Sequence, residues 1–217
     1  DTFQDAKEYG SILTVKAANY DGLLDYIKEI QQHGANDLAV SAWIGEIADK
    51  LPALIKQANI MSRKYDVCVT NPPYRGISDC SEKLNDFAKE HYPYSKSDFS
   101  TIFMEKTMSL CNTYGFMSMI NIPMWMSKSS FTNLRKSFLT NYTFVNMLHC
   151  GRGIFGSDFG TVSFAISKHH IKNYLATFRQ LFDELGAVDS IQQKEQWFYE
   201  GKGTYITYPD KFLNISS

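Results

Sequence analysis

A short motif directly after an apolar segment carries the most specific chemistry in this sequence. Residues 66–70 form a β-branched, apolar run that is typical of a strand buried inside a parallel sheet. The run ends at Asn-Pro-Pro-Tyr, residues 71–74, where the two prolines fix φ and lack an N–H group. Neither a helix nor a strand ladder continues through such a segment, so we expect a rigid corner, here called the hook (residues 71–74). Open α/β sheets bind ligands at the carboxyl ends of their strands, and the hook is therefore predicted to be a functional site.

The groups on the hook suit methyl transfer to an exocyclic amine of a nucleic-acid base. Such an amine is a poor nucleophile because its lone pair is delocalised into the ring, and acceptors on its two hydrogens free that pair. The side-chain oxygen of Asn71 and the carbonyl of Pro72 provide two uncharged acceptors, and Pro73 sets their angle. The ring of Tyr74 is suited to stack on a base flipped out of a duplex, as base chemistry requires. The alternative, a plain turn, is less favoured because an apolar strand immediately precedes the motif.

Composition places limits on the function classes. With 217 residues, 44% of them hydrophobic, the chain is long enough to bury one core with a small appendage. The formal net charge of −1 gives no overall basic signature, so a nucleic-acid partner requires a local basic cleft. The four cysteines form no Cys-x-x-Cys pair, which indicates free thiols in a reducing compartment. The sequence has neither a signal peptide nor an apolar stretch of about 18 residues, so we expect a cytoplasmic protein with no membrane partner.

Hydrophobic spacing divides the chain into three parts. Residues 1–64 are predicted to be a helical segment that links to, or is inserted in, the following domain. Residues 65–170 alternate strands and helices, which implies a parallel sheet with crossover helices and a final antiparallel hairpin. Residues 171–217 are predicted to be a helix to about residue 185 and an irregular tail. The expected helices are 19–32, 35–50, 52–64, 81–92, 97–111 and 129–140, and the expected strands are 66–70, 116–122, 142–149 and 161–168.

The hook resembles the catalytic motif of amino-group DNA methyltransferases, Asn/Asp/Ser-Pro-Pro-Tyr/Phe, in the version typical of enzymes that act on adenine. Three further segments match the gamma-type adenine methyltransferases in the expected order. Residues 97–105 look like the helix after the motif, and residues 115–120 look like the next strand. Residues 155–162 resemble the late loop whose aromatic residue contacts the flipped base.

More narrowly, the chain resembles the PglX family of large methyltransferases from BREX phage-defence systems, and related fused type II restriction-modification enzymes. The segments that carry this likeness are residues 5–12, 57–66, 92–98, 125, 129–131 and 151–161. The likeness covers nearly the whole chain. It implies an α/β, Rossmann-like S-adenosylmethionine-dependent methyltransferase sheet, of which this chain holds the C-terminal half with an antiparallel last strand, preceded by the helical segment.

The sequence departs from this family at the cofactor motif. The Phe-x-Gly-x-Gly-like turn after the first strand and the acidic residues that hold the ribose are both missing. Gly151-Arg152-Gly153 is the nearest Gly-x-Gly, but it follows a late strand and no helix begins after it. The resemblance implies that the cofactor motif lies upstream of Asp1 and that a recognition region continues past Ser217. We therefore expect a fragment that is inactive alone and binds S-adenosylmethionine weakly or not at all.

The residues and the resemblance together assign candidate roles to individual positions. They are Asn71, Pro72, Pro73 and Tyr74 for catalysis; Tyr74, Phe155 and Phe159 for the target base; Phe103 and Asp98 for the cofactor; and Arg75 and Lys128 for the DNA backbone. Several of these residues also have a purely structural interpretation. Asp98 is suited to cap a helix, Phe103 fits an apolar core stripe, and Lys128 fits a solvated surface. The sequence does not decide which of the two loop aromatics contacts the base.

Metal and hydrolytic chemistry are not indicated. His149 and Cys150 end a strand before a loop, but no second ligand stands at metal-binding spacing, and the pair at 169–170 has no carboxylate partner in view. The resemblance implies methyl transfer from S-adenosylmethionine to the amino group of a flipped adenine in double-stranded DNA, in restriction-modification or BREX phage defence. Other phage-defence or restriction subunits are candidate partners. Two alternatives stay open: a non-catalytic scaffold module, and a methyltransferase that acts on an RNA base or a protein glutamine.

Overall fold

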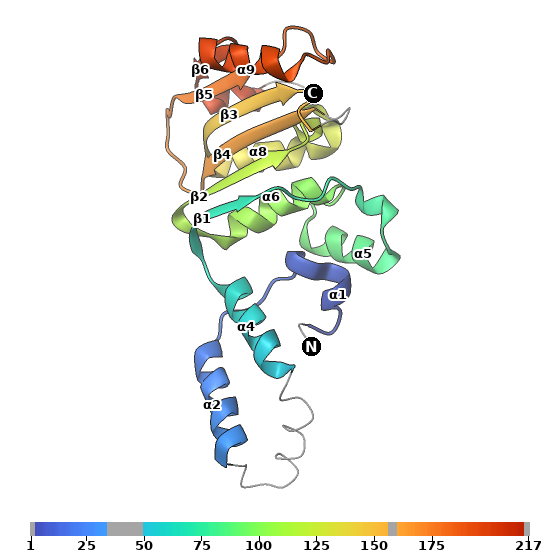
Figure 1. The fold of residues 1–217 in the computed structure, drawn as a ribbon, viewed down its shortest axis with the longest axis vertical. Coiled ribbons are helices and arrows are strands. Elements are labelled where there is room, and N and C mark those ends of the chain that lie inside the picture. Colours follow the sequence, from blue (N-terminus) through green and yellow to red (C-terminus); the bar gives the residue numbers. More distant parts are fainter. Residues whose placement is uncertain (1–2, 34–49, 156–159, 215–217) are drawn as a thin grey trace. The chain divides into compact units, whose positions relative to one another are not determined.

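The computed structural model describes residues 3–33, 50–155 and 160–214, and the chain forms two compact units, 1–64 and 65–217 (Figure 1). The first unit contains α1 (Ala6–Tyr9), a 3₁₀ turn η1 (Gly10–Ile12), α2 (Tyr20–His33) and α4 (Leu51–Ser62). The helices expected over 19–32 and 52–64 are confirmed, whereas the helix expected over 35–50 falls on residues 34–49, outside the described part. No helix in the described ranges is long and apolar enough to cross a bilayer.

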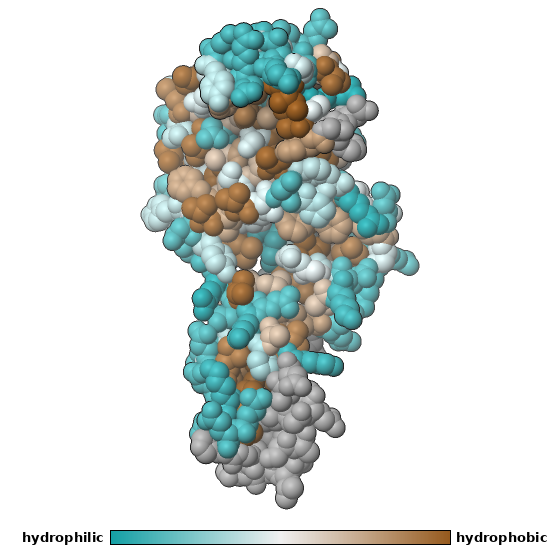
Figure 2. Space-filling view, in the orientation of Figure 1, coloured by the Kyte–Doolittle hydropathy of each residue, from teal (hydrophilic) through white to brown (hydrophobic). Residues whose placement is uncertain are grey.

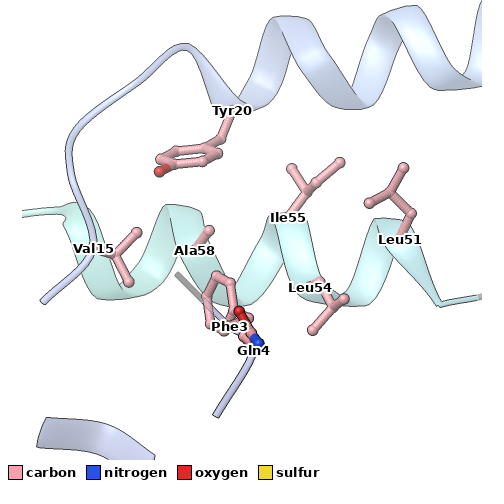
Figure 3. Close-up of a pocket in the computed structure, with 8 residues that line it drawn as sticks. All are labelled: Phe3, Gln4, Val15, Tyr20, Leu51, Leu54, Ile55 and Ala58. Carbon is pink, nitrogen blue, oxygen red and sulfur yellow. The ribbon is translucent and has the colours of Figure 1, made fainter. Parts of the chain in front are cut away.

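Helices α2 and α4 of the first unit pack against each other. The Asn59 amide donates to Asp21 Oδ1 at 2.8 Å, and Arg63 lies 3.6 Å from the other oxygen of that carboxylate. A cavity of about 540 Å³ lies beside this pair, lined by Phe3, Gln4, Val15, Tyr20, Leu51, Leu54, Ile55 and Ala58 (Figure 3). Most of the lining side chains are apolar, Gln4 and Tyr20 add polar groups, and none of the eight is charged.

The second unit is built on a six-stranded mixed sheet with the order β1-β2-β4-β3-β5-β6. The strands are β1 (Tyr65–Thr70), β2 (Cys111–Asn121), β3 (Thr143–Gly151), β4 (Thr161–Ser167), β5 (Ala176–Gln180) and β6 (Thr204–Thr207). Strands β1 and β2 pair in parallel, as do β3 and β5, whereas β4 runs antiparallel to both β2 and β3. The expected antiparallel hairpin is thus confirmed, and the carboxyl ends of β1, β2, β3 and β5 share one edge of the sheet.

The helices of this unit are α5 (Glu82–His91), α6 (Phe99–Leu110), α7 (Met124–Ser127), α8 (Thr132–Asn141) and α9 (Ile191–Glu200), with 3₁₀ turns η2 (Ile77–Asp79), η3 (Ser129–Phe131) and η4 (Pro209–Asn214). Of these, α6 and α8 pack against the same face of the sheet (Figure 1). Met104 of α6 and Phe138 of α8 pack on the sheet core. Trp125 of α7 stacks on Phe144 with ring centroids 6.3 Å apart and meets Phe164 edge-on at 5.6 Å. This aromatic cluster fixes α7 on β3 and β4.

The opposite face of β1 is open. Residues 66–70 were expected to be buried on both faces, but Val67 is 60% exposed and Val69 is 73% exposed, so this expectation is wrong. The reason is that only the Cys68 face of β1 packs against the core, and the side chains of Val67 and Val69 point to the opposite face. Phe116 of β2, which pairs with Val67, is exposed on the same face. Apolar side chains are visible at the surface of this unit in Figure 2.

The segment after residue 171 also differs from expectation. The helix expected over 171–185 is absent, and β5 occupies its centre, followed by α9 and β6. Apolar residues at 174, 175, 178, 181, 182 and 185 fit helical spacing, but pairing with β3 overrides this local pattern. Ala176 and Phe178 then share one face of the strand, on which Phe178 packs against the core. The tail therefore extends the sheet.

The packing of Phe164 generates a stability prediction. Its ring is 1% exposed at the centre of the aromatic cluster, and replacing it with alanine leaves a cavity there. We expect Phe164→Ala to lower the free energy of unfolding by about 3–5 kcal/mol. Phe155→Ala, at an exposed position, is the control and is expected to change it by less than about 0.5 kcal/mol. Urea unfolding followed by tryptophan fluorescence checks both values, and equal effects of the two substitutions would contradict this description of the core.

Candidate active site

The hook stands at the carboxyl end of β1 with the side chain of Asn71 exposed. The side chains of Asn71 and Pro73 are exposed, Pro72 is buried, and Tyr74 is half-buried. The Tyr74 hydroxyl donates to Asn71 Oδ1 at 2.5 Å and also lies 3.2 Å from the main-chain oxygen of Ile120 in β2. One phenol therefore connects the hook to the neighbouring strand. Because the ring bridges two strand ends, its direction is fixed by the backbone of both.

The protonated Tyr74 hydroxyl and the neutral Asn71 amide together form an uncharged site with a free hydrogen-bond acceptor. Partial burial raises the pKa of Tyr74, so its hydroxyl keeps its proton near neutral pH and acts as a donor. A carbonyl oxygen has two lone pairs, and the contact with Tyr74 uses one of those on Asn71 Oδ1. The second lone pair is available to a ligand because the side chain of Asn71 is exposed.

Backbone contacts hold the segment after the hook against the start of α6. Gly76 forms an isolated antiparallel bridge with Asp98. The Phe99 N–H donates to the Arg75 carbonyl at 3.0 Å, and the Ile77 N–H donates to Ser97 at 3.2 Å. The hook is thus braced on both sides: by β2 through its phenol and by the N-terminus of α6 through the residues that follow it.

Asp98 acts as the cap of α6. Its carboxylate is 5% exposed and accepts hydrogen bonds from the Ser100 N–H at 2.8 Å and the Ser100 hydroxyl at 2.6 Å. Burial raises the pKa of Asp98, while the bonds from Ser100 and the nearby charge of Lys128 oppose that rise. The sequence predicted a helix capped by residue 97 or 98. The structure confirms this prediction, with Asp98 as the N-cap. Phe103, on the next turn, is half-buried and packs against the core. Neither residue forms an open pocket for a cofactor among the described contacts.

A second asparagine at the sheet edge was missed by the sequence analysis. Asn121 ends β2 with its side chain fully buried. Its Nδ2 donates to the Ser100 carbonyl at 3.1 Å, and its Oδ1 accepts from the Ile122 N–H at 2.7 Å. Asn121 therefore fixes the first turn of α6 to the end of β2, beside the strand residue that contacts Tyr74. The only sequence signal for it is a polar residue placed between an apolar strand and a proline.

The Gly-rich loop between β3 and β4 reaches the same edge. A Cβ atom on Gly160 would lie 3.2 Å from Pro123 Cγ, so the end of this loop passes directly over the segment that follows β2. Phe155, on the loop, is 57% exposed. Phe159 lies outside the described residues. The hook and the Gly-rich loop are therefore brought to one edge of the sheet, as the sequence order predicts.

The two basic candidates lie at the surface near this edge. Arg75 Nη2 donates to the Asp79 carbonyl at 2.6 Å, which folds the side chain back along its own loop and leaves its other N–H groups available. Lys128 is exposed directly after α7, close enough to Asp98 for its charge to act on that carboxyl. Both are accessible to a polyanion.

The strand-end residues His149 and Cys150 have structural partners. The Gly151 N–H donates to His149 Nδ1 at 3.1 Å, and burial, together with the charge of Lys194, lowers the pKa of this imidazole. Burial raises the pKa of Cys150, so its thiol stays protonated. In the part of the chain that the structure describes, no group of three His, Cys, Asp or Glu side chains is arranged to hold a metal ion.

Comparison with known proteins identifies a methyltransferase family and two similar relatives. A family model described as the Eco57I restriction-modification methylase matches residues 8–155. The adenine-specific methyltransferase BrxX of Escherichia coli O9:H4 (strain HS) is 35% identical over 188 residues, and the adenine-specific methyltransferase PglX of Lacticaseibacillus casei (strain Zhang) is 31% identical over 201. These alignments cover 84% and 90% of this chain but only 15% and 16% of the relatives, so the chain spans about one-sixth of their length.

Solved structures agree on the fold. The DrdV–DNA complex matches with a TM-score of 0.52 at 13% identity, over 75% of this chain and 19% of that one. The ATP-dependent Type ISP restriction-modification enzyme LlaBIII bound to DNA also has a TM-score of 0.52, at 12% identity, over 72% of this chain and 13% of that one. The α/β methyltransferase fold and the family expected from the sequence are thereby confirmed. The chain belongs to the Eco57I restriction-modification methylase family.

Proposed function

We propose that this chain is part of a site-specific DNA methyltransferase that transfers a methyl group from S-adenosylmethionine to the exocyclic amino group of a flipped adenine. The observation that carries the proposal is the exposed amide of Asn71, held at the carboxyl end of β1 by two prolines and the Tyr74 hydroxyl. Family membership supports it, as do the two relatives, both of which are named adenine-specific methyltransferases. Restriction-modification or BREX phage defence is the setting that we propose for the whole protein.

The hook prepares the amine for attack. The two hydrogens of the adenine amino group are donated to Asn71 Oδ1 and to the Pro72 carbonyl oxygen, which draws the nitrogen toward tetrahedral geometry and frees its lone pair. S-adenosylmethionine, when bound, would supply the methyl group from its sulfonium, and the methylated amine would release one proton to solvent. No general base is assigned, because the amine can lose its proton to solvent after methylation. The hook contributes by holding its two acceptor oxygens in place before the base binds.

Tyr74 is proposed to act in two ways. Its ring stacks on the face of the flipped base, and its hydroxyl keeps the Asn71 oxygen aimed at the amine by donating its hydrogen to that oxygen while it lies 3.2 Å from the Ile120 carbonyl oxygen. Phe155 or Phe159 on the Gly-rich loop is proposed to meet the edge of the base. Arg75 and Lys128 are proposed to contact DNA phosphates from the surface beside the hook.

The methyl donor is proposed to bind mainly outside this chain. Asp98 is occupied as the cap of α6 and Phe103 packs on the core, so the two residues assigned to the cofactor contribute at most the border of its site. We propose that the Gly-rich cofactor motif lies N-terminal to Asp1 in the intact protein, and that the helical unit 1–64 links to or is inserted in the catalytic domain. Double-stranded DNA and other defence or restriction subunits are the proposed partners.

The first prediction concerns the amide of Asn71. In the full-length protein, Asn71→Ala removes one of the two acceptors, and we expect methyl transfer to fall by about 10²–10³-fold or more. Affinity for DNA should stay within about twofold, because no phosphate contact is lost. Transfer of radiolabelled methyl groups to unmethylated genomic DNA measures the first quantity, and filter binding measures the second.

The matched control for this change is Asn141→Ala, at an exposed position at the C-terminal end of α8, directly before the start of β3 and therefore at the opposite edge of the sheet. It should leave both quantities unchanged. Methyl transfer by Asn71→Ala at the unsubstituted rate would remove the proposed mechanism. Transfer to RNA or protein in place of DNA would redirect the proposal to another substrate.

The second prediction separates the two roles of Tyr74. Tyr74→Phe keeps the ring but removes a hydroxyl contact worth about 0.5–1.5 kcal/mol, so kcat should fall by about 2- to 10-fold while KM for DNA is little changed. Tyr74→Ala also removes base stacking, worth about 1–3 kcal/mol, so it should additionally raise KM for DNA. Steady-state kinetics with the full-length protein distinguish the two variants. If the Tyr74→Phe variant and the unsubstituted protein had identical kinetic constants, the hydroxyl would not orient Asn71.

A further inference from the structure

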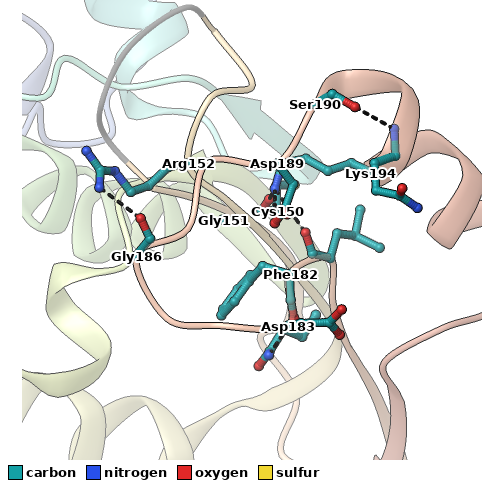
Figure 4. A network of polar contacts seen from close by, with 12 residues as sticks. Cys150, Gly151, Arg152, Phe182, Asp183, Gly186, Asp189, Ser190 and Lys194 are labelled. Atoms are coloured by element: carbon teal, nitrogen blue, oxygen red, sulfur yellow. Dashed lines mark hydrogen bonds and ion pairs between the residues drawn. The ribbon is translucent and has the colours of Figure 1, made fainter.

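A buried lysine from the C-terminal part of the chain contacts the sheet edge. Lys194 on α9 is 2% exposed, and its Nζ donates to the Cys150 carbonyl at 2.9 Å and to the Leu181 carbonyl at 3.0 Å (Figure 4). Cys150 lies near the carboxyl end of β3, and Leu181 directly follows β5. The ammonium therefore joins the ends of two parallel strands at the edge where the hook stands on β1.

The charge of Lys194 has a single counter-ion among its contacts. Asp189 Oδ2 lies 3.7 Å from Nζ, and this oxygen is buried without a hydrogen-bond partner. A buried ammonium is costly unless its donors are matched by acceptors and by an opposite charge. Here two carbonyls and one carboxylate meet that requirement. The arrangement is a closed polar cluster, and the groups it holds are the strand ends and the turn that carries Asp189.

The first turn of the Gly-rich loop passes directly over this cluster. Gly151 has φ of +70°, and a Cβ atom there would lie 2.9 Å from Phe182 Cδ1 and 3.1 Å from Lys194 Nζ. The loop backbone thus sits against the ammonium with no room for a side chain. Two further contacts restrain the same turn: Arg152 Nη1 donates to the Gly186 carbonyl at 2.9 Å, and a Cβ on Gly153 would meet Val188 at 3.1 Å.

Helix α9 has anchors that do not depend on Lys194. Ser190 caps its N-terminus through the Gln193 N–H at 3.1 Å. Near its C-terminus, Arg179 of β5 donates to the carbonyls of Trp197 and Phe198 at 3.1 Å and 2.7 Å. The helix therefore stays docked without the ammonium, whereas the ends of β3 and β5 and the loop above them lose a shared donor.

We propose that Lys194 is a positioning residue for methyl transfer: it fixes residues 151–155 of the Gly-rich loop, and with them Phe155, relative to the hook. The inference rests on the proposed function. It adds a residue outside positions 8–155, the part of the chain that the family model matches. It also makes α9 a component of the catalytic unit, although this helix lies in the segment first expected to be an irregular tail.

The test uses the full-length protein with Lys194→Met, which keeps the length of the side chain and removes its donors and charge. Amide hydrogen exchange in residues 151–155 should become about tenfold faster, because the loop opens locally more often. Exchange in residues 191–200 should stay within about twofold of the unsubstituted protein. In the same protein, kcat for methylation of unmethylated genomic DNA should fall about tenfold, with KM for S-adenosylmethionine unchanged.

Lys172→Met, at an exposed position on the same unit, is the matched control and should change neither readout. Gly151→Ala is a second variant that disturbs the same contact from the loop side while Lys194 stays in place. It should reproduce both the faster loop exchange and the lower kcat. This variant keeps the test decisive if Lys194→Met fails to fold.

Three results would overturn the role of Lys194. They are unchanged loop exchange, faster loop exchange with an unchanged kcat, and α9 exchange that rises as much as loop exchange. Failure of the proposed function is a separate result, because it would show as full methyl transfer by Asn71→Ala whatever the loop does. If Asn71→Ala inactivates the enzyme but neither Lys194→Met nor Gly151→Ala affects it, only the inference about Lys194 is contradicted.

Discussion

The Tyr74 hydroxyl links the only exposed amide of the hook to the backbone of the adjacent strand, and the geometry of the site depends on this contact. Without it, Asn71 would be a surface side chain with free rotation about its χ angles. With it, the amide oxygen has a defined direction relative to Ile120, and the prolines fix the backbone from which the side chain starts. Burial raises the pKa of the phenol and thereby keeps the proton that makes the contact.

The rest of the sheet edge supports this contact in successive layers. Asn121 attaches α6 to the end of β2, the backbone bridge between Gly76 and Asp98 attaches the residues after the hook to α6, and Gly160 packs on the segment that follows β2. Each of these contacts uses backbone groups or short side chains, which tolerate little displacement. The polar cluster around Lys194 restrains the first turn of the Gly-rich loop. Under the proposed function, rigidity at the hook and restraint at the loop serve the same requirement, a fixed place for one flat base.

Signals within a few residues of each other in the sequence were sufficient to predict several helices and strands. The strand before the hook, the capped helix that starts at Asp98 and the hairpin of β3 and β4 all follow from apolar periodicity, caps and prolines within a few residues. Features that depend on distant pairing were not predictable. Ala176 and Phe178 form a strand because β3 is beside them, and Val67 and Val69 are exposed because only the opposite face of β1 packs against the core. Asn121 and Lys194 belong to no motif, so only their burial reveals them.

A structure of the full-length protein bound to a DNA duplex that contains its methylation site would test the central claim most directly. We predict a flipped adenine whose amino nitrogen lies within about 2.7–3.2 Å of both Asn71 Oδ1 and the Pro72 carbonyl oxygen. The adenine ring should stack on the ring of Tyr74. An adenine that remains in the duplex, or an amino group that meets neither oxygen while Asn71 stays bonded to Tyr74 alone, would contradict it.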